Sequence, residues 1–253
     1  MEAERRWDAA AYHQASDVQE ARAEALLERL PLRGEETVLD AGCGSGRATL
    51  RLLERLPRGR VIAVDSSEQM VEHARETLGD RATVIHSDLT ELELEQPVDA
   101  VFSNAVFHWV RDQERLFTRM YTALWPGGIM VAGFGAPGNL DELLGVAGEV
   151  AGEPPFDRHL AAYEPGWRFR GAEETEARLL AAGFTDVHAE VDSVAETPLD
   201  PAGYLRTAPL LCHLELLPKD LHDHFVSEVV SRAGAPLRID HVRLQVEARR
   251  PGD

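Results

Sequence analysis

The chain has 253 residues and a net charge of −18; 44% of the residues are hydrophobic and 28% are charged. This composition is ordinary for one sizeable globular domain, while the surplus of negative charge disfavours nucleic acid as a partner, because phosphates would be repelled. No apolar run approaches the ~20 residues that span a bilayer, and the opening MEAERRWDAAAY lacks the apolar core of a secretory signal. We therefore expect neither a nucleic-acid nor a membrane partner.

Cysteine usage indicates a reducing compartment. Cys43 and Cys212 are the two cysteines of the chain, which excludes a disulfide scaffold. Neither has a cysteine or histidine nearby at the spacing of a zinc site. We predict a cytoplasmic protein without a metal site.

The first half of the chain alternates between helical and strand patterns. The expected helices cover 20–30, 47–56, a segment that begins with a capping box at 66–69 and ends at 78, and a segment capped by Asp112. The expected strands cover 37–40, 60–64, 83–86, 100–103 and 129–134. Such alternation with short crossovers predicts a parallel sheet with helices on both faces. Ligands of such sheets lie beyond the carboxyl ends of the strands.

The second half is less regular. Helical patterns cover 139–151, 173–182 and 219–233, a loop covers 153–170, and strand patterns cover 185–191 and 240–248. The last two strands are expected to form a hairpin-like pair at the sheet edge, with a helical insertion between them. The whole chain is therefore predicted to be one α/β domain with a doubly wound sheet.

A glycine-rich loop follows the first strand, in the stretch VLDAGCGSGRATLRLLERL. A dinucleotide fingerprint, G-x-G-x-x-G, would require a glycine where this chain has Arg47. Here Asp40 precedes Gly42, Gly44 and Gly46 instead, in the pattern D-x-G-x-G-x-G. A tight turn without a ligand is the alternative interpretation of the glycines alone.

Two further carboxylates end the next two strands. Asp65 ends the second strand, where it can accept hydrogen bonds from both hydroxyls of a ribose. Asp88 ends the third, where it can accept from an adenine amino group while Leu89 flanks the ring and Met70 packs against it. Taken singly, the aspartates can equally cap turns and Met70 can belong to the core. Three acids at three successive strand ends favour a nucleoside site.

Together these motifs identify a family. Residues 7–134, with VLDAGCGSG, VIAVDSSEQM, SDL, SNAVFHWVRD and LWPGGIM, resemble the class I S-adenosylmethionine-dependent methyltransferases that act on small acids, above all the trans-aconitate and malonyl-acyl-carrier-protein methyltransferases. The later WRFRGAEETEARLLAAGFTDV is similar to the family's stretch before its sixth strand. The resemblance implies a Rossmann-like, seven-stranded, mostly parallel sheet with an antiparallel strand near the C-terminus, a helical cap, and S-adenosylmethionine as cofactor.

The resemblance also divides the chain and adds cofactor residues. It implies an N-terminal helical lid over 1–36, a cofactor-binding core over 37–134, and substrate-cap insertions over 135–182 and 195–238, the last without a counterpart in the family. Tyr12 and Gln19 would close over the methionine end of the cofactor. Asn104, a polar residue at a buried strand end, would face a backbone or ligand amino group. The expected cofactor-binding residues are Tyr12, Gln19, Asp40, Gly42, Gly44, Gly46, Asp65, Ser66, Met70, Asp88, Leu89 and Asn104.

The acceptor is less well defined. His108 is a candidate for positioning the acceptor or acting as its base, whereas packing in the loop is the simpler interpretation for Trp109. The segment 163–170 adds Tyr163, Trp167, Arg168 and Arg170, and paired arginines suit a carboxylate, although solvated surface charge explains them equally well. A carboxylate acceptor is already ionised at neutral pH and needs cations rather than a base. We predict O-methylation of a small carboxylic acid, with two alternatives: C-, N- or hydroxyl O-methylation of a quinone-like or natural-product acceptor, and a regulatory protein that binds the cofactor without turnover.

Overall fold

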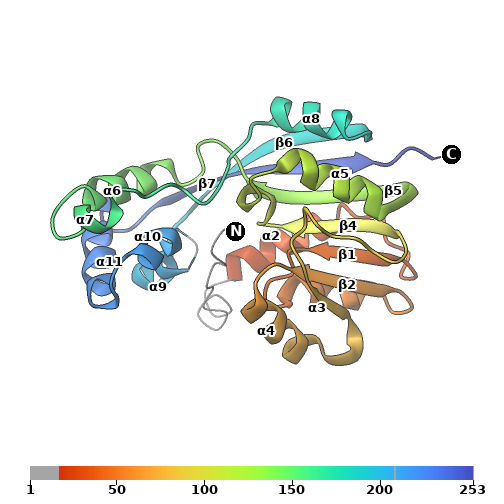
Figure 1. The fold of residues 1–253 in the computed structure, drawn as a ribbon, viewed down its shortest axis with the longest axis horizontal. Helices are drawn as coiled ribbons and strands as arrows, with labels where there is room; N and C mark the ends of the chain where they lie inside the picture. Colours follow the sequence, from red (N-terminus) through yellow and green to blue (C-terminus); the bar gives the residue numbers. More distant parts are fainter. Residues whose placement is uncertain (1–16, 208, 253) are drawn as a thin grey trace.

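The computed structural model of the protein describes residues 17–207 and 209–252. Its centre is a seven-stranded sheet with the order β3-β2-β1-β4-β5-β7-β6 (Figure 1). The strands are β1 (Thr37–Ala41), β2 (Arg60–Asp65), β3 (Thr83–His86), β4 (Val98–Asn104), β5 (Leu124–Gly135), β6 (Thr185–Glu196) and β7 (Ile239–Arg249). Strand β7 is antiparallel to β5 and to β6, whereas the other neighbouring pairs are parallel. The predicted mixed, doubly wound sheet is confirmed.

Helices cover both faces of this sheet. On one face α2 (Asp17–Leu27), α3 (Arg47–Arg55) and α4 (Glu68–Leu78) pack on the apolar residues of β1, β2, β4 and β5. On the other face lie α5 (Gln113–Ala123) and α8 (Ala172–Ala181), which bury Phe117, Met120 and Leu179 in the largest core cluster. Short 3-10 turns follow α4 and β4, as η1 (Gly79–Arg81) and η2 (Phe107–Trp109).

Local sequence explains where these helices begin. The hydroxyl of Ser67 accepts a hydrogen bond from the backbone N–H of Met70, so the cap of α4 is Ser67 rather than Ser66. The carboxylate of Asp112 accepts from the N–H of Arg115 at 2.9 Å and caps α5, as predicted. Each cap satisfies a helix donor that has no partner within its own helix.

The remaining helices form a separate lobe beyond the carboxyl ends of the parallel strands, at the left of Figure 1. Its members are α6 (Asp141–Ala151), α7 (Asp157–Leu160), α9 (Pro201–Arg206), α10 (Leu211–Leu216) and α11 (Lys219–Ala233). They share a hydrophobic cluster of their own, with Phe156, Leu160 and Phe225 inside it. Of the range 135–182 that the sequence assigns to a cap, α8 packs instead against β6 on the sheet.

Two strands, β5 and β6, extend at least five residues beyond their sequence patterns. Strand β5 begins at Leu124, before Pro126-Gly127-Gly128, and its register with β4 shifts between Val98 and Ala100 to accommodate these residues. Strand β6 continues to Glu196, because it pairs with β7 without a break from His188 onward. Along the described chain, no helix combines the length and apolarity needed to cross a membrane.

Candidate functional site

The glycine loop between β1 and α3 has a backbone that only glycine adopts easily. Gly42, Gly44 and Gly46 have φ values of 88°, 54° and 88°, in the left-handed region. A side chain on Gly42 would collide with Val106, and one on Gly46 would press on Leu78 at 3.1 Å. A side chain on Gly44 would meet no atom within 4 Å. Gly42 and Gly46 therefore serve packing, whereas Gly44 presents bare backbone to open space.

Two aspartates, at the ends of β1 and β2, flank this loop. The carboxylate of Asp65 accepts hydrogen bonds from the N–H of Gly44 and the N–H of Ser67, both at 2.9 Å. Burial raises the pKa of Asp65, and these backbone hydrogen bonds oppose the rise. Asp40 is more deeply buried, accepts from the hydroxyl of Thr49 at 2.7 Å, and has its pKa raised to about 7 by burial and by the charge of Asp65.

The ends of β2 and β3 supply an apolar slot with a carboxylate at its edge. Met70 and Leu89 are buried, at 3% and 5% exposure. Oδ1 of the exposed Asp88 accepts from the N–H and the hydroxyl of Thr90, at 2.7 and 2.8 Å, which fixes the direction of the carboxylate. Met70, Asp88 and Leu89 all line the same cavity, together with Ser66.

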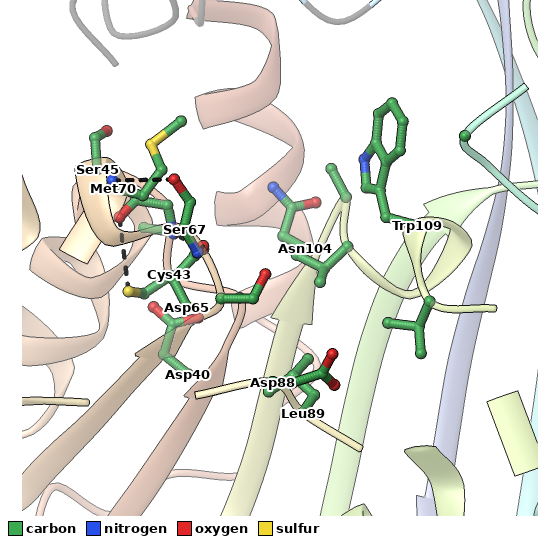
Figure 2. Close-up of a pocket in the computed structure, with 18 of the residues that line it drawn as sticks. Asp40, Cys43, Ser45, Asp65, Ser67, Met70, Asp88, Leu89, Asn104 and Trp109 are labelled. Carbon is green, nitrogen blue, oxygen red and sulfur yellow. Dashed lines mark hydrogen bonds between the residues drawn. The ribbon is translucent and has the colours of Figure 1, made fainter. Parts of the chain in front are cut away.

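That cavity has a volume of about 780 Å³ and extends across the carboxyl ends of the parallel strands. Figure 2 shows Asp40, Asp65, Met70 and the loop residues on one side of it and Asn104 and Trp109 on the other. Ten of the predicted site residues line it: Asp40, Gly42, Gly44, Asp65, Ser66, Met70, Asp88, Leu89, Asn104 and Trp109. Gly46, the last glycine of the loop, is not in the lining.

His108 belongs to the wall behind the cavity rather than to its lining. It is 9% exposed, and its Nδ1 accepts a hydrogen bond from the N–H of Gly135 at 3.2 Å. Its ring packs beside those of Trp109 and Phe169, and its carbonyl accepts from the N–H of Arg168. Because its Nδ1 accepts this hydrogen bond and its ring lies outside the lining, His108 packs in the wall of the cavity. This differs from the role in positioning or proton transfer predicted for it.

The predicted arginine pair does not face the cavity. The Arg168 guanidinium turns back to the carbonyls of Pro165 and Trp167, at 2.9 and 3.0 Å. Arg170 forms an ion pair with Glu174 at 3.2 Å and lines a smaller hollow on the outer surface. Trp167 is buried and packs edge-on against Trp109, with 5.4 Å between ring centroids. Local hydrogen bonds and an exposed ion pair thus account for both arginines.

Tyr163 lies in the helical lobe, stacked on His213 at 3.9 Å between ring centroids. Burial raises the pKa of Tyr163 and lowers that of His213 to about 4, so both rings are neutral near pH 7. Tyr12 lies outside the described residues, and so does the side chain of Gln19, whose backbone is in α2. Their predicted contacts with the methionine end stay predictions.

The structure adds lining residues that the sequence analysis missed. Cys212, Glu215 and Leu216 of α10 face the cavity, and Glu164 and Gly166 border it from the preceding loop. The first three are spaced i, i+3 and i+4, the spacing of one helix face. This spacing is visible in the sequence, but nothing in the sequence indicates that the face turns to the cavity.

Comparison with known proteins agrees with this geometry. Residues 38–128 match the family model described as "Methyltransferase domain". The chain is 32% identical to a trans-aconitate 2-methyltransferase of Azoarcus sp., over 94% of each chain. It is 37% identical to that of Methylobacterium nodulans, over 71% of this chain and 69% of the relative.

Solved structures show the same fold at lower identity. The YcgJ protein from Bacillus subtilis superposes with a TM-score of 0.65 at 13% identity, over 92% of this chain and 99% of that one. Phosphoethanolamine N-methyltransferase 2 of Haemonchus contortus, in complex with S-adenosyl-L-methionine, gives 0.64 at 22% identity, over 96% and 56%. The fold, the glycine loop and the full-length relatives lead to one conclusion: this chain belongs to the family of S-adenosylmethionine-dependent methyltransferases that includes the trans-aconitate 2-methyltransferases.

Proposed function

We propose that this methyltransferase transfers the methyl group to a carboxylate oxygen of a small polycarboxylic acid of the trans-aconitate kind. The proposal is supported by the relatives named trans-aconitate 2-methyltransferase, one of which aligns over 94% of both chains and so includes the acceptor half. Buried Cys43 and Cys212, both without a disulfide, suit the cytoplasm as the proposed compartment.

The residues present fit the cofactor. The bare backbone at Gly44 leaves room for a ligand to lie against it. Asp65 would hold the ribose hydroxyls, Asp88 the adenine amino group, and Met70 and Leu89 the faces of the ring. S-adenosylmethionine, when bound, supplies an electrophilic methyl group on a sulfonium. The protein's part is to align the acceptor with the methyl group and to exclude water.

The observation that carries the choice of acceptor is the state of His108. A phenol or amine acceptor requires removal of a proton, and His108 was the candidate base. Its Nδ1 is occupied by the N–H of Gly135, and its ring is in the wall rather than in the lining. A carboxylate oxygen needs no base, because it is already ionised at neutral pH and would accept the methyl group without losing a proton.

The test is a panel of small acids with cofactor carrying a labelled methyl group. We expect transfer to a tri- or dicarboxylic acid and a product that loses its label in mild base, because esters hydrolyse. A base-stable product would indicate C- or N-methylation or an ether. Cofactor binding by calorimetry without transfer to any acceptor would favour a regulatory protein.

A further inference from the structure

A cluster of basic side chains lies beneath α2, on the face of β7 that the helix covers. Arg243 and His241 are two residues apart on β7 and therefore point to the same face, and Arg22 reaches them from α2. Glu196, at the end of β6, is 3.9 Å from the Arg22 guanidinium and 3.1 Å from His241 Nε2. The hydroxyl of Tyr204 lies 3.1 Å from the same Nε2.

The charges of this cluster are of both signs: Asp192 of β6 is the register partner of Arg243, and its charge, like that of Glu196, acts on Arg22. Burial, followed by the charges of Arg22 and Arg243, lowers the pKa of His241 to about 3, so this ring is neutral. Two guanidinium groups then share the cluster with the carboxylates of Glu196 and Asp192. Nη2 of Arg22 and Oε2 of Glu196 are both buried, and neither makes a hydrogen bond within the described structure. The cluster thus holds desolvated charged groups of both signs, and its own hydrogen bonds satisfy them incompletely.

Arg243 connects the cluster to the cavity. Its Nη2 donates to Oδ1 of Asn104 at 2.7 Å and to the carbonyl of Gly133 at 2.8 Å. A guanidinium can only donate, so the amide atom that faces it is the oxygen. The NH₂ of Asn104, which lines the cavity, is therefore the end left to face a ligand. It can donate to a carboxylate, whereas the sequence analysis expected it to face an amino group.

Gly133 makes this arrangement possible. A Cβ at Gly133 would lie 3.0 Å from Nη2 of Arg243 and 3.1 Å from Cδ2 of Leu26. The missing side chain leaves room for the guanidinium beside β5 and next to Leu26 of α2. The charge is thereby placed beside the end of β4 rather than out in solvent.

The order of the strands separates this site from the proposed cofactor contacts. Asp88 is at the end of β3, Asp65 at the end of β2, the glycine loop follows β1, and Asn104 ends β4. Neighbouring strands are ~4.8 Å apart, so the cofactor contacts advance along the sheet edge toward β4. Arg243 lies one step farther, over β5. We propose that the NH₂ of Asn104, whose amide Arg243 orients, binds a carboxylate of the acceptor.

This inference rests on the proposed function, and a purely structural role is its competitor. Arg29 supplies the comparison within the same chain. It follows α2 and joins it to the same two strands, through Glu190 at 2.5 Å, Gln245 at 2.5 Å and Glu247 at 2.8 Å. None of these three partners lines the cavity, whereas Asn104 does. Arg29 therefore shares the fastening role of Arg243 without the contact to the cavity.

The experiment compares Arg243→Met with Arg29→Met, using trans-aconitate as acceptor. A lost charged hydrogen bond is worth about 1.5–3 kcal/mol, so KM for trans-aconitate should rise about 10- to 100-fold in Arg243→Met. Its affinity for trans-aconitate, measured by calorimetry in saturating S-adenosylhomocysteine, should fall by the same factor. S-adenosylmethionine Kd should stay within about threefold. Arg29→Met should lower the melting temperature and leave KM unchanged.

Three results would overturn the inference: an unchanged KM in Arg243→Met, a rise in S-adenosylmethionine Kd as large as the rise in KM, or an equal rise in KM in Arg29→Met. The second result would mean that the carboxylate bound there is that of the cofactor. If Arg243→Met does not fold, Arg243→Lys takes its place, since it keeps the charge and loses the planar, two-pronged guanidinium group. About a tenfold rise in KM is then expected, and an unchanged KM would refute the inference. Failure of the wild-type protein to methylate any acid would instead refute the proposed function.

Discussion

Replacing Asp40 with Asn should change how the stability of this protein depends on pH. Asp40 is 1% exposed and has one charge-neutral hydrogen-bond donor, the hydroxyl of Thr49. Burial raises its pKa from the ordinary value of 3.8 to about 7. Between these two values the folded protein retains a proton that the unfolded chain has lost. The free energy of unfolding therefore falls as pH rises through this window and levels off above pH 7.

The shift of about three units corresponds to about 4 kcal/mol, at 1.36 kcal/mol per unit. About 3 kcal/mol of this should appear between pH 5 and pH 8.5, because part of the change is complete by pH 5. Asn is nearly isosteric, its oxygen can still accept from Thr49, and it does not titrate. The measurement is urea unfolding of wild type and Asp40→Asn at several pH values. As pH rises from 5 to 8.5, we expect the free energy of unfolding of the variant, relative to that of the wild type, to increase by about 3 kcal/mol.

Subtracting the wild-type free energy of unfolding from that of the variant at each pH cancels the titration of groups that both proteins share. Asp80→Asn, on the exposed turn after α4, controls for the loss of one negative charge from an acidic chain. Its difference from wild type should change little with pH. A difference between Asp40→Asn and wild type that is as flat as that of the control would refute the reasoning, because it would mean that Asp40 ionises at its ordinary value.

Further predictions concern the loop, the cofactor and a helix cap. Gly42→Ala should lower the free energy of unfolding in urea by more than about 2 kcal/mol, since it combines a left-handed φ with a collision against Val106. Gly79→Ala has a left-handed φ but open space around the new side chain, so it should lower the same free energy by only about 1 kcal/mol. Equal losses in the two variants would contradict the packing argument. Asp65→Ala should weaken S-adenosylmethionine binding by about 1.5–3 kcal/mol in calorimetry, and unchanged affinity would remove Asp65 from the site. Asp112→Ala should lower the unfolding free energy by about 1 kcal/mol, and no loss would mean that solvent replaces the cap.

The sheet and the glycine loop were predictable because local sequence determines them. Strand β3 was predicted with the bounds that the structure has. As expected, one helix ends at Gly79 and another begins at Asp112. Asp65 and Asp88 line one cavity because parallel strands bring their carboxyl ends to one edge. That step follows from topology alone.

The acceptor side was not predictable in the same way. Arg168 and Arg170 attracted attention as neighbouring cations, but a side chain's direction depends on its local partners: two carbonyls for one and Glu174 for the other. Arg243 was overlooked because the sequence of β7 does not show what covers its polar residues. Helix α2 covers them, a contact between segments distant in sequence.

The far ends of β6 and β7 have a consequence for how acceptor preference can diverge. Glu196 and Ile239 are register partners, so the chain leaves the sheet and returns to it at the same place. An insertion whose first and last residues adjoin neighbouring strands at the same register can be shortened, lengthened or replaced without moving those strands. Glu215 and Leu216 line the cavity and belong to this insertion, residues 197–238. The glycine loop and the three strand-end aspartates lie outside it. Grafting residues 197–238 from a relative onto this chain should therefore exchange the part of the cavity lining that contains Glu215 and Leu216, and leave the sequence of the glycine loop and of the three aspartates unaltered.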